Sequence, residues 1–186
     1  MKKPKCIGLA KAPYASLEKF IEILEKHNYL VIKLDYVALE IFKEQLKMPI
    51  AEEELYLKKN MIWEIFGKSY LAEKAVLDWM PWVESYAEVE PGRFQYAITD
   101  IETPEEVNYL RMKFGDDFKL IAVSPPRSIR LARFKNQMKM SEADFIKLEK
   151  EIGNRGLAKV IMQAEIIAVT DDDEKEILKI FENLWA

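Results

Sequence analysis

The chain has 186 residues, of which 49% are hydrophobic and 11% aromatic, so it can form one domain with a substantial core. Its 28 Lys and Arg residues nearly balance 32 Asp and Glu residues, and the net charge of -4 gives no general attraction to nucleic acid or anionic lipid. No apolar run could span a bilayer and the amino-terminal residues do not form a signal peptide, so we expect a cytoplasmic protein without membrane contacts.

Apolar runs separated by helical patterns predict the strands and helices in chain order. The first helix follows Ser16 as its N-cap and carries Leu17, Phe20 and Leu24 at helical spacing. The lone Cys6 lies within the first run and is expected to be a buried small hydrophobe. The predicted strands are Cys6–Ala10, Tyr29–Ile32, Phe94–Thr99, Lys119–Val123 and Glu165–Val169.

The later helices carry clear start and stop signals. Thr103 and Glu106 form a capping-box pattern around Pro104, and this helix is expected to end near Gly115. An arginine-bearing helix follows Pro126, and the pattern from Ser141 to Asp144 starts another helix. Negative charge at the start of the terminal helix comes from Asp171, Asp172 and Asp173. The only histidine, His27, follows Lys26 near a helix end, where the helix dipole is a sufficient account of it.

Strands that alternate with helices imply a five-stranded, mainly parallel sheet covered by helices on both faces. Residues from about 37 to 89 are rich in helix formers and predict a helical insertion rather than a separate domain. We expect this insertion to overhang the carboxyl edge of the sheet, where ligands bind in such folds. The whole chain, 1–186, is predicted to be a single α/β domain.

The order of these segments resembles archaeal nucleotide kinases related to adenylate and dephospho-coenzyme A kinases. The clearest stretch runs from Ile98 through Pro104 to Val123, and Arg130 and Arg133 match the arginine pair on the helix that leads to the family's lid. The resemblance implies a three-layer P-loop NTPase fold. It also implies a subdomain similar to the nucleoside-monophosphate site at about 36–90 and a short lid-like region at about 134–157.

The phosphate-binding loop departs from the family pattern G-x-x-x-x-G-K-[ST], in which backbone N–H groups, a lysine and a hydroxyl hold phosphate and magnesium. Here Lys11 and Ser16 stand at the glycine positions, Leu17 at the lysine position and Glu18 at the hydroxyl position. Side chains restrict the positive-φ conformations that glycines allow. We therefore expect residues 10–16 to lack an open anion-binding nest, with Pro13 and Tyr14 filling much of its space.

The acceptor side departs from the family as well. Asp35 matches an acidic position near the acceptor site. Ala38, Trp63 and Glu102 stand where arginines are expected, which removes bidentate phosphate recognition. The lid segment 135–139 lacks the family's arginine cluster.

Several residues remain as site candidates, each with a structural alternative. Asp100 ends the third strand and could hold magnesium or its waters, or be a loop carboxylate bonded to nearby amides. Arg130 and Arg133 could clamp phosphate or pair with acidic side chains. Arg155 could approach a nucleotide, although Gly153 and Gly156 beside it fit helix-ending residues. The phosphate- or nucleotide-binding candidates are Gly8, Ser16, Asp35, Arg130, Arg133 and Arg155.

Three tryptophans belong to the helical insertion. Trp63, Trp79 and Trp82 are expected to pack in its core, whereas an exposed Trp79 and Trp82 pair beside Pro81 would indicate a partner surface.

Two functions are compatible with these observations. The favoured one is a pseudo-kinase that acts as a binding or assembly module, as a homo-oligomer or with a homologous kinase subunit. The alternative is a divergent ATP-dependent kinase of a nucleotide or of dephospho-coenzyme A. It would use Lys11 or Lys19, with Asp100 on magnesium, and only this alternative calls for ATP and Mg²⁺ as cofactors.

Overall fold

The computed structural model describes residues 3–51, 54–86 and 94–185, except for the side chains of residues 56 and 57. Five strands form one sheet in the order β2-β3-β1-β4-β5, and every pairing between neighbours is parallel. The predicted α/β class and the predicted strands are confirmed, with shifts of a residue or two at the ends. The strands are β1 (Cys6–Lys11), β2 (Tyr29–Lys33), β3 (Gln95–Thr99), β4 (Phe118–Val123) and β5 (Ile166–Ala168).

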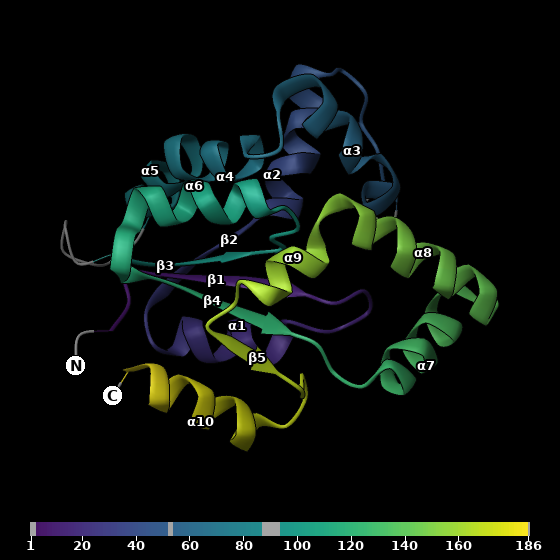
Figure 1. The fold of residues 1–186 in the computed structure, drawn as a ribbon. Helices are drawn as coiled ribbons and strands as arrows, with labels where there is room; N and C mark the ends of the chain where they lie inside the picture. Colours follow the sequence, from purple (N-terminus) through teal and green to yellow (C-terminus); the bar gives the residue numbers. More distant parts are fainter. Residues whose placement is uncertain (1–2, 52–53, 87–93, 186) are drawn as a thin grey trace.

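Two helices cover one face of the sheet, α1 (Glu18–Lys26) and α10 (Glu174–Trp185), as Figure 1 shows. Their apolar sides meet beneath the strands, where the rings of Phe20 and Phe181 lie 5.9 Å apart. Ile7 and Leu9 of β1 point into this core. Because successive strand residues alternate between faces, Cys6 and Ala10 belong to the core on the opposite side.

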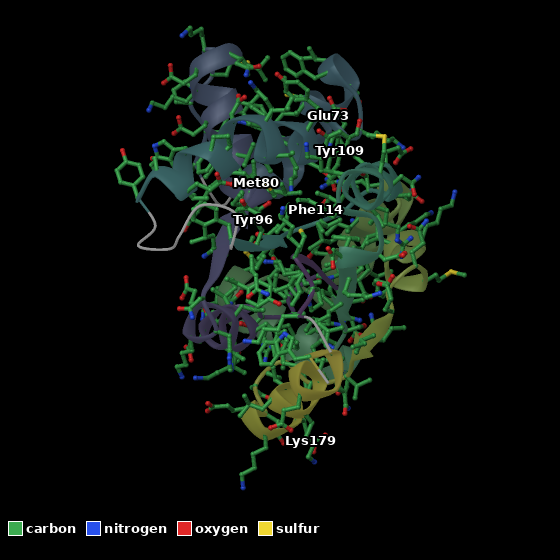
Figure 2. All side chains as sticks on the ribbon, turned by 90° about the vertical axis from the view of Figure 1, so that its left-hand side faces the viewer. Glu73, Met80, Tyr96, Tyr109, Phe114 and Lys179 are labelled. Atoms are coloured by element: carbon green, nitrogen blue, oxygen red, sulfur yellow. The ribbon has the colours of Figure 1, made fainter. Side chains whose placement is uncertain are left out.

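The other face is covered by several short helices and by α6 (Figure 1). Figure 2 shows Met80, Tyr96 and Phe114 lying together between this layer and the sheet, and the rings of Tyr96 and Phe114 are 6.2 Å apart. The elements of this side are α2 (Leu34–Glu40), the π-helical turn η1 (Ile41–Gln45), α3 (Leu55–Phe66), α4 (Tyr70–Lys74), the π-helical turn η3 (Ala75–Trp79), α5 (Met80–Tyr86), α6 (Pro104–Phe114), the 3-10 turn η4 (Gly115–Asp117) and α9 (Leu157–Met162).

Two further helices, α7 (Arg127–Met138) and α8 (Glu142–Arg155), lie beyond the carboxyl ends of the strands (Figure 1). Both predicted capping boxes are present: Thr103 with Glu106 starts α6, and Ser141 with Asp144 starts α8. The N-cap position of α1 is Leu17 rather than the predicted Ser16, although Oγ of Ser16 accepts a hydrogen bond from the N–H of Glu18 at 3.2 Å.

Other predictions about single residues met different outcomes. Gly156 ends α8 with φ 115°, but Gly153 lies inside the helix, so only one of the two glycines ends it. Cys6 is fully buried, and burial raises the pKa of its thiol, as expected for an inert core residue. The ring of His27 packs against that of Trp185 at 4.2 Å with a tilt of 56°, and burial lowers the pKa of its imidazole. Aromatic packing rather than a favourable helix-dipole charge therefore accounts for His27.

The tryptophans divide between core and surface. Trp63 is buried and Trp79 is partly buried, as predicted, but Trp82 is 55% exposed. The rings of Trp79 and Trp82 meet edge to face at 5.7 Å, and Trp82 meets Tyr86 in the same way at 5.2 Å. The expectation that Trp82 packs in the core is wrong, because it lies on the outward side of α5. Among the described helices, none is both long enough and apolar enough to span a bilayer.

Candidate functional site

Two adjoining hollows lie at the carboxyl edge of the sheet, with volumes of about 300 and 590 Å³. The smaller one reaches toward α8 and has mostly apolar walls, including Leu148 and Ile152. The larger one runs along the loop between β1 and α1 toward Arg133 and Asp171. The residues that line both are Lys11, Tyr14, Ala15, Asp35, Asp100 and Gln137.

An ion pair forms the floor shared by the two hollows. Lys11 ends β1 and Asp100 follows β3, the neighbouring strand, so their side chains meet with Nζ 2.9 Å from Oδ1. Burial alone would raise the pKa of Asp100, but Lys11 and Lys59 outweigh it and lower this pKa. Burial opposes the charge on Lys11 as well, yet Asp100 and Asp35 raise its pKa above the ordinary value. Both groups are therefore charged at neutral pH and neutralise each other.

Asp100 is also held by its own strand. Thr99 donates a hydrogen bond from Oγ1 to Oδ2 of Asp100 at 2.7 Å, and Asp100 has φ 63°, in the left-handed region that non-glycine residues seldom adopt. The side chain of Asp100 is 6% exposed, so the carboxylate is a fixed part of the floor.

A second buried cation, Lys59 of α3, was not identified from the sequence. Its Nζ lies 2.6 Å from Oδ1 of Asp35 and 3.0 Å from Oε1 of Glu102, and its side chain is 1% exposed. The two carboxylates raise the pKa of Lys59 despite its burial. Burial raises the pKa of Asp35, and Lys59 partly offsets that effect. The ammonium also lies 5.8 Å from the ring centre of Trp63.

The charges continue from Glu102 toward α6 and α8. Arg155 places Nη1 3.6 Å from Oε2 of Glu102 and donates from Nη2 to Oε1 of Glu151 at 3.1 Å. Glu106 accepts hydrogen bonds from the main-chain N–H groups of Glu102 and Thr103 through Oε2, while its buried Oε1 has no hydrogen-bond partner among the described residues. Burial raises the pKa of Glu106 to about 7. Arg155 thus serves this network and lines a separate surface depression with Trp63.

The loop between β1 and α1 directs several of its N–H groups inward. Ala12 donates to the carbonyl of Val123 at 2.9 Å, and Ala15 donates to the carbonyl of Ala12 at 2.9 Å. The N–H of Ser16 donates to Oδ2 of Asp171 at 2.7 Å. Tyr14 adopts φ 63°, so the loop does contain a left-handed residue although glycine is missing.

Tyr14 also ties the loop to the helices beyond the sheet. Its ring meets Phe134 edge to face at 5.0 Å and lies 6.2 Å from Phe145. The ring therefore packs toward α7 and α8 and forms part of the wall of both hollows, and Pro13 lines the smaller one.

Both arginines of α7 pair with acidic side chains. Arg130 donates to Oε1 of Glu149 at 2.8 Å and to the carbonyl of Pro13 at 3.3 Å. Arg133 forms a bidentate pair with Asp171, with Nη2 3.0 Å from Oδ1 and Nη1 bonded to Oδ2. The sequence left open whether these arginines bind phosphate or pair with acidic side chains. In this structure they pair with acidic side chains.

The remaining sequence candidates lie farther from the shared floor or play other parts. Gly8 is in the middle of β1, where a Cβ atom would lie 2.7 Å from Cζ of Phe118. Lys19 lines the larger hollow but bonds Glu22 on its own helix at 2.9 Å. Leu17, at the position of the family's lysine, is 5% exposed and packs in the core beneath the sheet.

The aspartates before α10 divide their roles. Asp173 accepts hydrogen bonds from the N–H groups of Lys175 and Glu176, which is the helix-start role predicted for this run. Asp171 instead turns to Ser16 and Arg133, so its predicted role at the helix start is wrong. Sequence spacing held no signal for this contact, since Asp171 and Ser16 are separated by 155 positions.

No group of three or more His, Cys, Asp or Glu residues in the described parts of the chain is arranged to hold a metal ion. The donor set at the floor also fits a magnesium ion poorly, because the carboxylate of Asp100 faces the ammonium of Lys11.

Solved structures with the same architecture include several kinases, each at low sequence identity. Dephospho-CoA kinase from Campylobacter jejuni matches with a TM-score of 0.56 and 16% identity, over 100% of this chain and 98% of that chain. This chain has a P-loop kinase fold. Shikimate kinase from Bacteroides thetaiotaomicron matches with a TM-score of 0.57 and 12% identity, over 96% and 95% of the two chains. A gluconokinase from Sinorhizobium meliloti 1021 matches with a TM-score of 0.53 and 12% identity, over 100% and 95%.

No protein-family model matches the sequence, and no curated protein matches it significantly. The likeness to the P-loop kinases is therefore one of fold, and the chemistry must be argued from the residues at the carboxyl edge.

Proposed function

We propose that this chain is a non-catalytic relative of the archaeal adenylate and dephospho-coenzyme A kinases, with a degenerate phosphate-binding loop. It would act in the cytoplasm as a binding or assembly module. The observation that carries the proposal is the Lys11–Asp100 pair, because the loop cation on the cleft floor is neutralised by a buried carboxylate at 2.9 Å. A lysine held in this way has little attraction left for a triphosphate.

The residue at the catalytic-lysine position supports the same conclusion. Leu17 is buried in the core and supplies no charge, and Glu18, at the position of the magnesium-binding hydroxyl, adds a negative one. Phosphoryl transfer depends almost entirely on positioning and on stabilisation of the developing charge by cations. The larger hollow is lined by more acidic than basic side chains: Glu18, Asp35, Asp100, Asp171 and Asp172 against Lys11, Lys19, Lys33 and Arg133.

The acceptor side provides a further argument. Ala38 and Trp63 are buried, and Glu102 binds Lys59 and Arg155, so none of these positions offers a free cation to an acceptor phosphate. We propose that Asp35 and Glu102 retain Lys59 as a structural cation. The proposed bounds of the acceptor-like subdomain, 36–90, and of the lid-like region, 134–157, belong to this proposal.

Support for an assembly role comes from exposed apolar side chains on η3 and α5. Trp82 and Tyr86 are 55% and 74% exposed and their rings meet at 5.2 Å, and Leu77 is 62% exposed. Adjoining exposed apolar side chains mark interaction surfaces more often than scattered ones do. We propose self-association, or association with a homologous kinase subunit, through a surface that includes Trp82.

A divergent kinase of a nucleotide or of dephospho-coenzyme A is the second candidate. One observation favours it: Lys11 and Asp100 lie side by side on the floor of both hollows, and the Lys11 side chain is 37% exposed. In such an enzyme Lys11 would contact phosphate and Asp100 would face Mg²⁺. The pairing between them argues against this use, so we derive no catalytic step from it.

Calorimetry with ATP and Mg²⁺ and a phosphate-transfer assay test the proposal. The acceptor panel is nucleoside monophosphates, dephospho-coenzyme A, shikimate and gluconate. Lys11→Met serves as the matched variant, because it removes the ammonium and keeps the length of the side chain. We expect millimolar or weaker binding and no turnover above that of Lys11→Met. Turnover on any acceptor that is lost in Lys11→Met would overturn the proposal and establish the kinase.

A further inference from the structure

The carboxylate of Asp171 is bound in the manner of an anionic ligand. Three separate segments meet at this point: the loop before α1 supplies the N–H of Ser16, α7 supplies the guanidinium of Arg133, and the loop after β5 supplies Asp171. The Asp171 side chain is 1% exposed, although it follows the exposed Val169 and the partly exposed Thr170. A main-chain N–H and a bidentate guanidinium are the groups that proteins commonly use to bind phosphate or carboxylate.

The contact between Ser16 and Asp171 lies where the phosphate-binding pattern would place a phosphate. Ser16 stands at the second glycine position of the phosphate-binding pattern, next to the start of α1, where the backbone N–H groups favour an anion. Ser16, Arg133 and Asp171 all line the hollow of about 590 Å³, so a solute that entered it would reach the same donors. In this structure both donors are bound to the carboxylate of Asp171.

We infer that Asp171 is an internal occupant of a latent anion site formed by the Ser16 N–H and the Arg133 guanidinium. The carboxylate takes the place that a phosphate group would take, and it excludes free anions because its effective concentration there is high. This inference rests on the proposed function and deepens it, since it explains why the loop between β1 and α1 does not bind phosphate.

Two other carboxylates act on the site. Asp172 lies 3.8 Å from Arg133 and its side chain is 74% exposed, while Glu18 adds to the negative potential around Arg133. Both remain when Asp171 is replaced, so the uncovered site should bind a small dianion only modestly. Asp172 also offers a matched control, because it is the adjacent aspartate and has no contact with Ser16 among the hydrogen bonds of the described residues.

The experiment titrates inorganic phosphate into the full chain against chloride at matched ionic strength, and follows the backbone amide resonance of Ser16 and the thermal midpoint. Asp171→Ala should bind phosphate at least tenfold more tightly than the wild type, which is about 1.4 kcal/mol. Asp172→Ala should raise phosphate affinity far less than Asp171→Ala does, because Asp171 still occupies the Ser16 N–H and the Arg133 guanidinium. Adding Arg133→Ala to Asp171→Ala should abolish the gain.

Asp171→Asn keeps the test decisive if the alanine variant does not fold. Its amide carries no charge to pair with Arg133, so phosphate affinity should again rise, but by less than in Asp171→Ala because the amide oxygen can still accept from Ser16. The inference is overturned if either folded variant binds phosphate no better than the wild type, or if the gain does not require Arg133.

The phosphate-transfer assay on Asp171→Ala separates this inference from the proposed function. Gain of phosphate binding without transfer supports both. No gain overturns the latent site and leaves the non-catalytic proposal standing. Gain of transfer would support the internal occupant but contradict the proposal that acceptor recognition is lost.

Discussion

The buried ammonium of Lys59 lies 2.6 Å from Oδ1 of Asp35, and this contact joins α3 to the first turn of α2. Glu102 approaches the same ammonium at 3.0 Å, so one cation neutralises acidic groups from two segments. Removing only the cation leaves carboxylates uncompensated in a poorly hydrated place, which costs more than the pair itself contributes.

We expect Lys59→Met to lower the free energy of unfolding by about 2–4 kcal/mol, with Asp35 discounted because its side chain is 31% exposed. Urea denaturation at pH 7 measures this. The control is Lys58→Met, the neighbouring residue with an exposed pair to Glu54, which should change stability by less than about 0.5 kcal/mol. Equal effects of the two variants would refute a structural role for Lys59.

Glu106 should make stability depend on pH. Its pKa is raised from 4.5 to about 7 in the folded protein, so the folded state holds a proton that the unfolded state has released between these values. Stability therefore falls as pH rises from about 4.5 to 7. Glu106→Gln should lack this dependence on pH. The difference in unfolding free energy between the variant and the wild type should therefore shift in favour of the variant by up to about 3 kcal/mol from pH 4.5 to pH 8.

The comparison for that variant is Glu105→Gln, the exposed neighbour, which should leave the slope unchanged. Urea midpoints collected across the pH range give both curves. If the curves for Glu106→Gln and the wild type run parallel, the burial of a titrating carboxyl group at this position is disproved.

Gly8 should be required by packing rather than by ligand binding. A Cβ atom there would lie 2.7 Å from Cζ of Phe118 and 2.9 Å from Cδ1 of Ile101, both in the core. We expect Gly8→Ala to cost about 1–3 kcal/mol. Gly153→Ala should instead stabilise the protein by about 0.5–1 kcal/mol, because Gly153 lies inside α8 and a Cβ atom there would meet no atom of the described residues within 4 Å. Thermal unfolding that ranks the two variants in the opposite order would contradict this assignment.

Trp82 should support assembly if the proposed module self-associates. Replacing it with serine should weaken association at least tenfold, or by about 1.4 kcal/mol, without loss of fold because the side chain is 55% exposed. Sedimentation equilibrium measures the constant. Met112→Ser, an exposed apolar residue on α6, is the control and should have no effect. A wild-type chain that stays monomeric at about 100 µM would rule out self-association through this surface.

Local sequence signals determined the strands, the helix starts and the fold class. The apolar runs at Cys6 and Lys119 predicted β1 and β4, and the patterns beginning at Thr103 and Ser141 predicted their capping boxes, because these features depend on residues a few positions apart. The absence of the expected lysine at Leu17 was also visible, since a motif position is read directly from the chain.

Only the tertiary structure decided how the charges at the site are used. Lys59 meets Glu102 across 43 positions, and Asp171 meets Ser16 across 155, so no spacing rule connects them. The parallel sheet brings the carboxyl ends of β1 and β3 side by side, which places Lys11 against Asp100. The sequence alone shows that the lysines, aspartates and glutamate among these residues are charged, but it does not show which charge lies beside which. Burial at the sheet edge requires each charge to be paired, and the fold alone selects the partner.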